Sequence, residues 1–489
     1  MTELYRSIDA LIDYAERQLN LDRKNEDFVR NGIFRLLGLQ EFSDATGEKC
    51  LDTKPDSALK RFVDACVKTG VFEKEDASYF CDGVMGELMM SPKDVQSGFD
   101  AILNTHGSTD AMQWFYDYSV KGDYVKKSQL DKNPRFDSEG LVVTINKSKP
   151  EFRDPKKAAS GNATKGGYPK CSICHENEGF AGRQKRTLRT VDITLGGQKW
   201  FWQFSPYGYF NQHGIAVNYE HIPMHVDRQT FGRLMDFVDT FPNYFIGCNA
   251  ALERIGGSVL AHDHYQGGGE ILPMHKAKAA YTLRSAKHPN AQVEVVDWAG
   301  TVVRVVSHER AEIEEIGDAI REKWVNYTDV EKQIVPVDGK GVHNAISPTV
   351  VKTARGYEMS IILRSNITSE IYPDGIFHAH PEFHIIKKES IGLIEAQGLF
   401  ILPGRLEAEL DQIETLIAEG KPLTEELADF ALVYNEVKER LGSTRSKKKV
   451  HEAMQRELGD ICNRILDNTA VFKEKTETVQ FLKDLGFSL

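Results

Sequence analysis

Two pairs of histidines, each with one residue between its members, recur along this chain in similar surroundings. Gly257 leads into His262-Asp263-His264, and Gly375 leads into His378-Ala379-His380. Each pair ends a segment whose composition favours β-strands. One motif at the end of two such segments indicates a duplicated unit, which restricts the chain to folds that repeat a sheet.

Hydrophobic periodicity separates helical ends from a β-rich middle. Up to about residue 135 the apolar residues follow the three-to-four spacing of buried helix faces, as from Leu4 to Leu19, and this spacing returns after Gly404. Between these ends one helix is predicted at 230–238. We predict an α+β chain whose strands lie at 141–145, 190–195, 199–204, 213–219, 241–250, 302–306 and 359–363, with a hairpin turn at Gly196-Gly197.

The composition indicates a globular protein that binds neither nucleic acid nor membranes. Hydrophobic residues make up 41% of the chain and charged residues 27%, as in ordinary globular proteins. The formal net charge of -11 leaves no positive excess to neutralise nucleic-acid phosphates. No apolar segment reaches the length of a membrane span, and the N-terminal residues lack the apolar core of a secretory signal. We therefore expect a cytoplasmic protein.

The segment that begins at His262 combines imidazoles, an amide and glycines. On an extended chain alternate side chains face the same way, so His262, His264 and Gln266 would share a face. A neutral imidazole nitrogen can attack phosphorus near pH 7, and glycines let backbone amides approach a phosphate. The pattern indicates phosphate chemistry, but a polar strand edge whose histidines only satisfy hydrogen bonds explains this segment equally well.

Cys171 and Cys174 are the two closely spaced members of a set of seven cysteines, too few for a disulfide scaffold in 489 residues. Two thiolates on one turn, with histidines from later strands, form a common tetrahedral zinc site. The alternatives are a redox pair or two inert thiols, but the flanks of a thioredoxin-like pair are absent. Zinc is favoured, and the spacing does not choose among the candidate ligands His213, His221, His225 and His262.

An ordered series of motifs resembles the hexose-1-phosphate uridylyltransferases of the histidine-triad superfamily. The motifs lie at 142–150, 169–174, 217–223, 262–266 and 377–397, and the resemblance covers roughly residues 138–404. It implies two histidine-triad-like antiparallel-sheet units, with helical extensions that suit the longer bacterial class of the family. The implied domains are 1–137 (helical), 138–285 (first unit, with the nucleophile), 286–404 (second unit) and 405–489 (helical).

The resemblance also assigns roles to the histidine motif. His264 corresponds to the family's nucleophile, which takes the uridylyl group from UDP-glucose and passes it to galactose 1-phosphate by a ping-pong route. Gln266 corresponds to the donor to a phosphoryl oxygen, worth about 10²–10³ in rate. One ring nitrogen of His264 is expected to donate a hydrogen bond to a backbone carbonyl. This bond would fix the tautomer in which the other nitrogen is free to react. The family's structural zinc would take Cys171, Cys174, His221 and His262.

Several positions depart from the family's pattern. Asp263 replaces a proline, and the segment before the histidines is one residue longer, with Ser258 as the implied oxyanion donor. Lys147 and Lys149 stand where the family has phosphate-binding arginines, and a lysine lacks the bidentate fork of arginine. The family's Tyr-Glu pair in the sugar-binding stretch is replaced by Leu393-Ile394. The remaining implied substrate-binding residues are Asn249 for uridine, and Lys388, Glu395 and Gln397 near the hexose.

The resemblance raises two further expectations, and other functions remain as alternatives. His378, His380 and His384, with Glu382 among them, could bind a second metal or could only repeat the duplicated fold. The family also implies a homodimer whose partner contributes to the sugar site. Other hypotheses are a histidine-triad nucleotidyltransferase or dinucleotide phosphorylase with another substrate, and a non-catalytic zinc-dependent interaction module.

Overall fold

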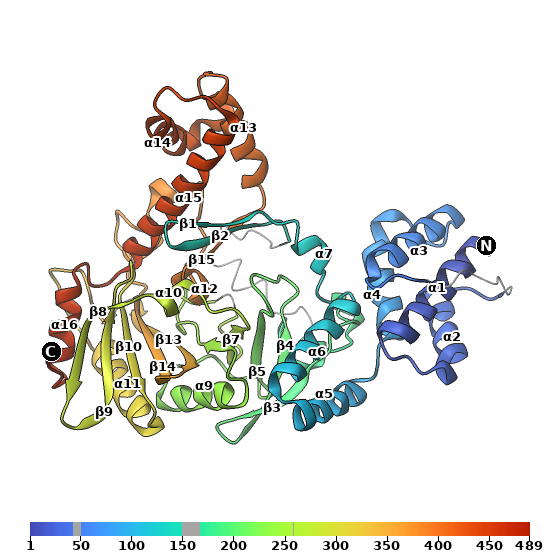
Figure 1. The fold of residues 1–489 in the computed structure, drawn as a ribbon, viewed down its shortest axis with the longest axis horizontal. Helices are drawn as coiled ribbons and strands as arrows, with labels where there is room; N and C mark the ends of the chain where they lie inside the picture. Colours follow the sequence, from blue (N-terminus) through green and yellow to red (C-terminus); the bar gives the residue numbers. More distant parts are fainter. Residues whose placement is uncertain (43–49, 149–166, 258) are drawn as a thin grey trace.

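A computed structural model describes residues 1–42, 50–148, 167–257 and 259–489 (Figure 1). Its centre is a ten-stranded sheet in the order β3-β4-β5-β7-β6-β13-β14-β10-β9-β8, in which every neighbouring pair is antiparallel. The strands are β3 (Val191–Leu195), β4 (Gln198–Phe204), β5 (Gly214–Asn218), β6 (Phe245–Gly247), β7 (His264–Gly268), β8 (Ala279–Ser285), β9 (His288–Val296), β10 (Val302–Ser307), β13 (Asn344–Thr353) and β14 (Gly356–Ser365).

The two halves of the chain meet at the pairing of β6 with β13. Gly247 lies opposite Thr349, and Ile246 lies opposite Val350. Strands β3 to β7 therefore form one side of the sheet, and β8, β9, β10, β13 and β14 form the other. The α+β class is confirmed, and the two predicted units share one continuous sheet. The residues at which the predicted domains begin and end stay predictions.

Local sequence accounts for most of these strands. The turn between β3 and β4 places Gly196 and Gly197 at φ 58° and 70°, the left-handed conformation that tight hairpins need and that glycine adopts without strain. The predicted strand at 241–250 is reduced to β6, because helix α9 (Arg228–Thr240) ends directly before it and the amide of Tyr244 bonds to the carbonyl of Phe241 in a turn.

The two faces of the large sheet are covered differently. Helices α9 and α11 (Arg310–Val325) pack on one face, where Tyr265 and Leu363 belong to the same apolar core as Phe231 and Ile316 of these helices. The opposite face is covered by two short helices, α10 (Pro273–Lys276) and α12 (Leu393–Ala396). Because side chains alternate along a strand, the neighbours of Tyr265 face α10 and α12.

A three-stranded sheet joins segments that are distant in sequence. In it β1 (Arg135–Ser138) pairs antiparallel with β2 (Leu141–Asn146), and β2 pairs parallel with β15 (Leu399–Pro403). Helix α15 (Lys447–Thr469) packs against β1 and β2, and with α13 (Leu406–Ala418) and α14 (Ala431–Leu441) it projects from the sheets in Figure 1. The predicted helical C-terminal region is confirmed.

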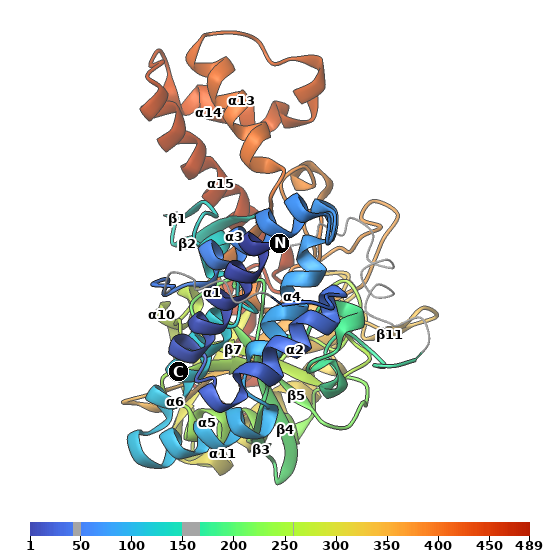
Figure 2. The same ribbon diagram turned by 90° about the vertical axis from the view of Figure 1, so that its right-hand side faces the viewer.

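The N-terminal region is also helical, as predicted, and packs at the β3 side of the large sheet. Figure 2 shows helices α1, α2 and α4 grouped on this side of the molecule. Among the described residues, no helix is long and apolar enough to cross a membrane. The remaining elements are α1 (Thr2–Gln18), α2 (Glu26–Leu37), α3 (Pro55–Thr69), α4 (Ala77–Leu88), α5 (Pro92–His106), α6 (Ser108–Lys121), α7 (Lys127–Leu130), β11 (Val337–Asp338), β12 (Gly341–Val342) and α16 (Lys475–Lys483).

Candidate active site

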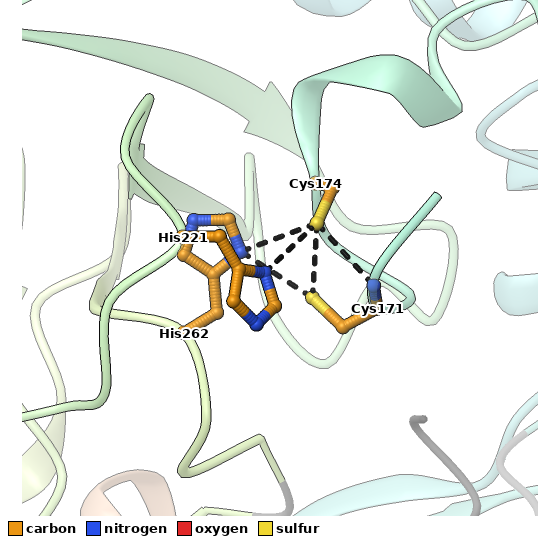
Figure 3. A group of neighbouring side chains, drawn as sticks. All are labelled: Cys171, Cys174, His221 and His262. Carbon is orange, nitrogen blue, oxygen red and sulfur yellow. Dashed lines mark hydrogen bonds between the residues drawn. The ribbon is translucent and has the colours of Figure 1, made fainter. Parts of the chain in front are cut away.

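Two cysteines and two histidines converge beside the first half of the sheet (Figure 3). The Sγ of Cys171 lies 3.4 Å from the Sγ of Cys174 and 3.3 Å from Nδ1 of His262. The Sγ of Cys174 lies 3.1 Å from Nδ1 of His221. All four donor atoms lie within 4.8 Å of one another. Two sulfurs and two imidazole nitrogens at this spacing fit a tetrahedral metal ion such as zinc.

Neighbouring groups hold these donors in place. The Nε2–H of His262 donates to the carbonyl of Asn218 at 2.7 Å, which leaves Nδ1 as the nitrogen that faces the cysteines. The buried amide of Asn177 donates to the carbonyls of Cys171 and Cys174, each at 2.8 Å. A hydrogen bond from the Cys174 thiol lowers the pKa of Cys171 to about 7. One sulfur is therefore readily available as a thiolate, the form that binds metals.

The other two candidate ligands lie elsewhere. The ring of His213 stacks on Tyr209 with centroids 4.8 Å apart, and His225 lies beside Asp227 and Asp263. The structure thus brings His221 and His262 to the cysteine pair, as the resemblance implies.

Strand β7 carries the second histidine of the motif into the middle of the first half-sheet. His264 lies opposite Val217 of β5, and Gln266 lies between Ile215 and Gly247. Glycine is required next along the strand, because a Cβ on Gly267 would lie 2.2 Å from the carbonyl oxygen of Phe245. Since Tyr265 faces α9, the side chains of His264 and Gln266 face α10 and α12.

The expected row of three side chains contains only His264 and Gln266. Strand β7 begins at His264, and the residue before it leaves the ladder: Asp263 donates its amide to Ile222 and accepts from the amide of Asn218. The side chain of His262 can therefore turn towards the cysteines, while that of His264 lies on the face of the sheet opposite to Tyr265.

His264 has a defined tautomer. Its Nδ1 lies 2.8 Å from the main-chain carbonyl of His262, which accepts the Nδ1–H, so the expected carbonyl contact is confirmed. Burial lowers the pKa of His264 to about 4. The ring is therefore neutral at pH 7, and its Nε2 carries a lone pair that can act as a nucleophile.

Asn249 links this strand to helix α12. It follows β6, whose Gly247 pairs with Gln266, and its Oδ1 accepts a 2.8 Å hydrogen bond from the amide of Leu393. Helix α12 carries Glu395, whose Oε1 accepts from the buried Nζ of Lys387 at 2.9 Å. Asn249, Gln266 and Glu395 are thus brought to the same face of the sheet.

The other predicted substrate-binding residues have contacts that do not involve His264 or Gln266. Gln397 is fully buried, with its Oε1 2.7 Å from Nε2 of His275. Lys388 is half-buried, and Lys147 forms a 3.1 Å ion pair with Glu407 of α13. Lys149 and Ser258 lie outside the described residues.

The histidines of the second pair contact backbone carbonyls. Nδ1 of His378 lies 3.2 Å from the carbonyl of Ala379, Nε2 of His380 lies 3.1 Å from that of Ile376, and Nε2 of His384 lies 2.9 Å from that of Ala379. Within the described ranges the cysteine–histidine cluster alone has the convergence expected of metal ligands. A second metal near His378 and His380 stays a prediction.

Comparison with known proteins finds similarity to one family along the whole chain. The N-terminal domain model of galactose-1-phosphate uridyl transferase matches residues 26–223, and the C-terminal domain model matches residues 237–428. The galactose-1-phosphate uridylyltransferase of Bifidobacterium longum subsp. longum is 54% identical, with 100% of this chain and 99% of the relative covered. The chain belongs to the galactose-1-phosphate uridylyltransferase family. The Halalkalibacterium halodurans protein of the same name is 34% identical over 96% of each chain.

A match to a solved structure is much weaker. Yeast Ap4A phosphorylase Apa2 is 12% identical, over 64% of this chain and 91% of that one, with a TM-score of 0.32. This score is too low to support a comparison of the two folds.

Asp263, the departure from the uridylyltransferase family's motif, is completely buried. Neither carboxylate oxygen has a hydrogen-bond partner among the described residues, and one of them lies 4.0 Å from Nδ1 of His225. Burial raises the pKa of Asp263 to about 6. An acid at this position therefore places a titratable group directly between the two histidines of the motif.

The sequence did not assign two buried residues to this face of the uridylyltransferase site. Lys387 is completely buried and bonds Glu395, whereas the family resemblance pointed to its neighbour Lys388. His213, predicted only as a possible zinc ligand, is buried beside Gln266. Position in the sheet would have pointed to His213, since it precedes β5, the strand that pairs with β7.

Proposed function

We propose that this chain is a UDP-glucose—hexose-1-phosphate uridylyltransferase that forms UDP-galactose and glucose 1-phosphate from UDP-glucose and galactose 1-phosphate. The observation that carries the proposal is the neutral imidazole of His264, oriented by the carbonyl of His262 and facing the same side of the sheet as Gln266. Family membership supports the choice of substrates.

The proposed reaction has two displacements at one phosphorus. Nε2 of His264 attacks the α-phosphorus of UDP-glucose, a P–N bond forms, and the P–O bond to glucose 1-phosphate breaks. A phosphate oxygen of galactose 1-phosphate then attacks the uridylyl-histidine, the P–N bond breaks, and UDP-galactose leaves. Gln266 donates its amide N–H to a non-bridging oxygen as negative charge builds up on it.

The substrate would lie along the face covered by α10 and α12. Asn249 contacts the uridine end in this proposal, and Glu395 contacts hexose hydroxyls. Lys147, Lys149 and Lys388 supply positive charge to the phosphates, and Ser258 donates to the phosphoryl group. Gln397 belongs to the hexose end, where its internal hydrogen bonds indicate that it supports the wall of the site.

The metal cluster has a structural task in this proposal. Zinc bound by Cys171, Cys174, His221 and His262 would tie the 171–174 turn and the loop before β7 together. The metal–ligand bonds would hold His262 in place, and the main-chain carbonyl of His262 orients the ring of His264. No reaction step needs the metal itself.

The decisive experiment is to detect the intermediate and its transfer. Protein incubated with UDP-glucose should gain the mass of one uridylyl group per chain, lose it on addition of galactose 1-phosphate, and give parallel double-reciprocal plots. The His264→Ala variant should gain none. Labelling by an adenine nucleotide and not by UDP-glucose would instead identify a different nucleotidyl transfer.

A matched control separates chemistry from folding. His288 is a buried histidine of β9, on the outer part of the second half-sheet, and His288→Ala should still be labelled. A non-catalytic zinc module predicts no label in any form of the protein. A homodimer is proposed on family resemblance alone, and the mass of the native protein in solution tests it. The cytoplasmic location stays a prediction.

A further inference from the structure

Helix α12 is held by a residue to which neither the family resemblance nor the proposed mechanism gives a role. The Nε2 of His275, in α10, lies 2.7 Å from Oε1 of Gln397, directly after α12. The Nε2 of Gln397 donates to the carbonyl of Leu393 at 3.1 Å. The oxygen of Gln397 is therefore the acceptor, and His275 donates its Nε2–H.

His275 is itself rigidly held. The buried guanidinium of Arg304 donates to the carbonyl of Met274 at 2.9 Å and to that of Ala277 at 3.1 Å, one on each side of His275. Arg304 is in turn paired with Glu294 at 3.3 Å. Helix α10 is thus fixed to strands β9 and β10 of the sheet before it contacts α12.

A second set of bonds shows that α10 and α12 form one unit. The amide of Met274 donates to the carbonyl of Gln397 at 3.0 Å, and the indole of Trp298 donates to the carbonyl of Ala396 at 2.9 Å. The turn after them is tight, because a Cβ on Gly398 would lie 2.7 Å from the ring of Trp298.

The other end of α12 reaches the nucleotide side of the site. The amide of Leu393 donates to Asn249 at 2.8 Å, and Glu395 lies two residues further along the same short helix. A shift of α12 would therefore move the groups proposed for uridine and for hexose together. A short helix of this kind has few internal hydrogen bonds, so its position depends on contacts such as that of Gln397.

Packing alone does not account for an imidazole at this position. The ring of His275 is buried, and its Nδ1 has no partner among the described residues. An unpaired buried polar atom destabilises the folded protein, and an apolar ring would fill the space without that cost. The distinctive contribution of the imidazole is its hydrogen bond to Gln397.

We infer that His275 is a positioning residue for the hexose end of the site: through Gln397 it holds α12 so that Glu395 and Asn249 keep their places relative to Gln266. This inference rests on the proposed function. Loss of the bond should weaken recognition of the hexose phosphate while His264 still accepts the uridylyl group.

The test uses isolated uridylyl-enzyme made with saturating UDP-glucose and then mixed with galactose 1-phosphate. In His275→Phe, the galactose 1-phosphate concentration that gives the half-maximal transfer rate should rise roughly tenfold, the effect of one lost hydrogen bond. The amount of uridylyl group per chain should equal that of the unsubstituted protein. His275→Gln, which keeps an N–H donor, should recover most of the loss.

Two further variants keep the inference falsifiable. Gln397→Leu, which also removes the 3.2 Å hydrogen bond from Oγ1 of Thr349, should raise the same concentration at least as much, and the double variant His275→Phe with Gln397→Leu should raise it no further than Gln397→Leu alone. Additive effects would overturn the inference, and so would an unchanged value in His275→Phe. His288→Phe is the control for loss of a buried histidine outside α10 and α12. Absence of uridylyl-enzyme in the unsubstituted protein would instead refute the proposed function.

Discussion

Nδ1 of His264 lies 2.8 Å from the main-chain oxygen of His262, so the first histidine of the motif orients the second. The ring of His262 faces Cys171 and Cys174, whereas His264 faces α10 and α12 across the sheet. One backbone carbonyl therefore connects the metal cluster to the proposed nucleophile. Because only the carbonyl makes this connection, the two side chains have separable tasks.

Substitution of each histidine should cause a different defect. His264→Ala should lower kcat by roughly 10⁴-fold or more, because the nucleophile is lost, and should leave metal content and the thermal midpoint close to those of the unsubstituted protein. His262→Ala should lose the metal and about 4 kcal/mol of stability. Metal analysis and thermal unfolding measured beside turnover test this. Equal loss of stability in both variants would contradict the division of tasks.

Removal of the metal should lower the stability of the protein, because the metal has a structural and not a chemical task in the proposed reaction. A chelator should remove about one zinc ion per chain and lower the thermal midpoint, and added zinc should restore it, because metal binding is coupled to folding of the cluster. Cys171→Ser should show the lowered midpoint without a chelator. Cys81, which lies outside the cluster, provides the control Cys81→Ser. A midpoint that is insensitive to the chelator in the native protein would argue against a structural metal.

Gln266 should contribute to the transition state more than to substrate binding. Gln266→Ala should lower kcat by about 10²–10³-fold with a small change in KM, because the donor acts on charge that develops during transfer. Gln266→Glu should be at least as slow, since a carboxylate repels the phosphoryl oxygens. Gln292, half-buried on β9, is the control position. An effect confined to KM would show that Gln266 only binds the ground state.

Part of the site was predictable from a family resemblance and part from local signals. The order of the motifs carried the resemblance that assigned His264 and Gln266, whereas the spacing of Cys171 and Cys174 on one turn is a local signal. The helical ends and the β3–β4 hairpin follow from periodicity and turn residues, which are also local. These features need no knowledge of which distant segments meet.

Long-range contacts account for what the sequence did not indicate. The pairing of β6 with β13 joins the two halves into one sheet, and nothing in either strand specifies its partner. Lys387 resembles any surface lysine until folding places Glu395 beside it. Gln397 was expected to contact the hexose, but its partners His275, Thr349 and Leu393 could be identified only once α10, α12 and β13 had been placed.

Acid should destabilise the protein through its buried histidines. Burial lowers the pKa of His213, His275 and His378 to about 4 in each case, whereas a histidine in the unfolded chain has a pKa of about 6.5. Between these values the unfolded chain binds protons that the folded chain does not. The free energy of unfolding is therefore at its full value above about pH 7 and falls as the pH decreases towards 4.

The size of this effect can be assigned to one residue. With these pKa values, each histidine removes about 1 kcal/mol of stability by about pH 5.5, so His275→Gln should lose that much less than the unsubstituted protein between about pH 7.5 and 5.5. Urea unfolding at the two pH values measures the difference, and loss of metal in acid cancels because both proteins share the cluster. His106, exposed at the end of α5, gives the control His106→Gln, which should follow the unsubstituted protein. If His275→Gln loses as much stability between these pH values as the unsubstituted protein, then His275 takes up a proton in the folded state as readily as in the unfolded chain.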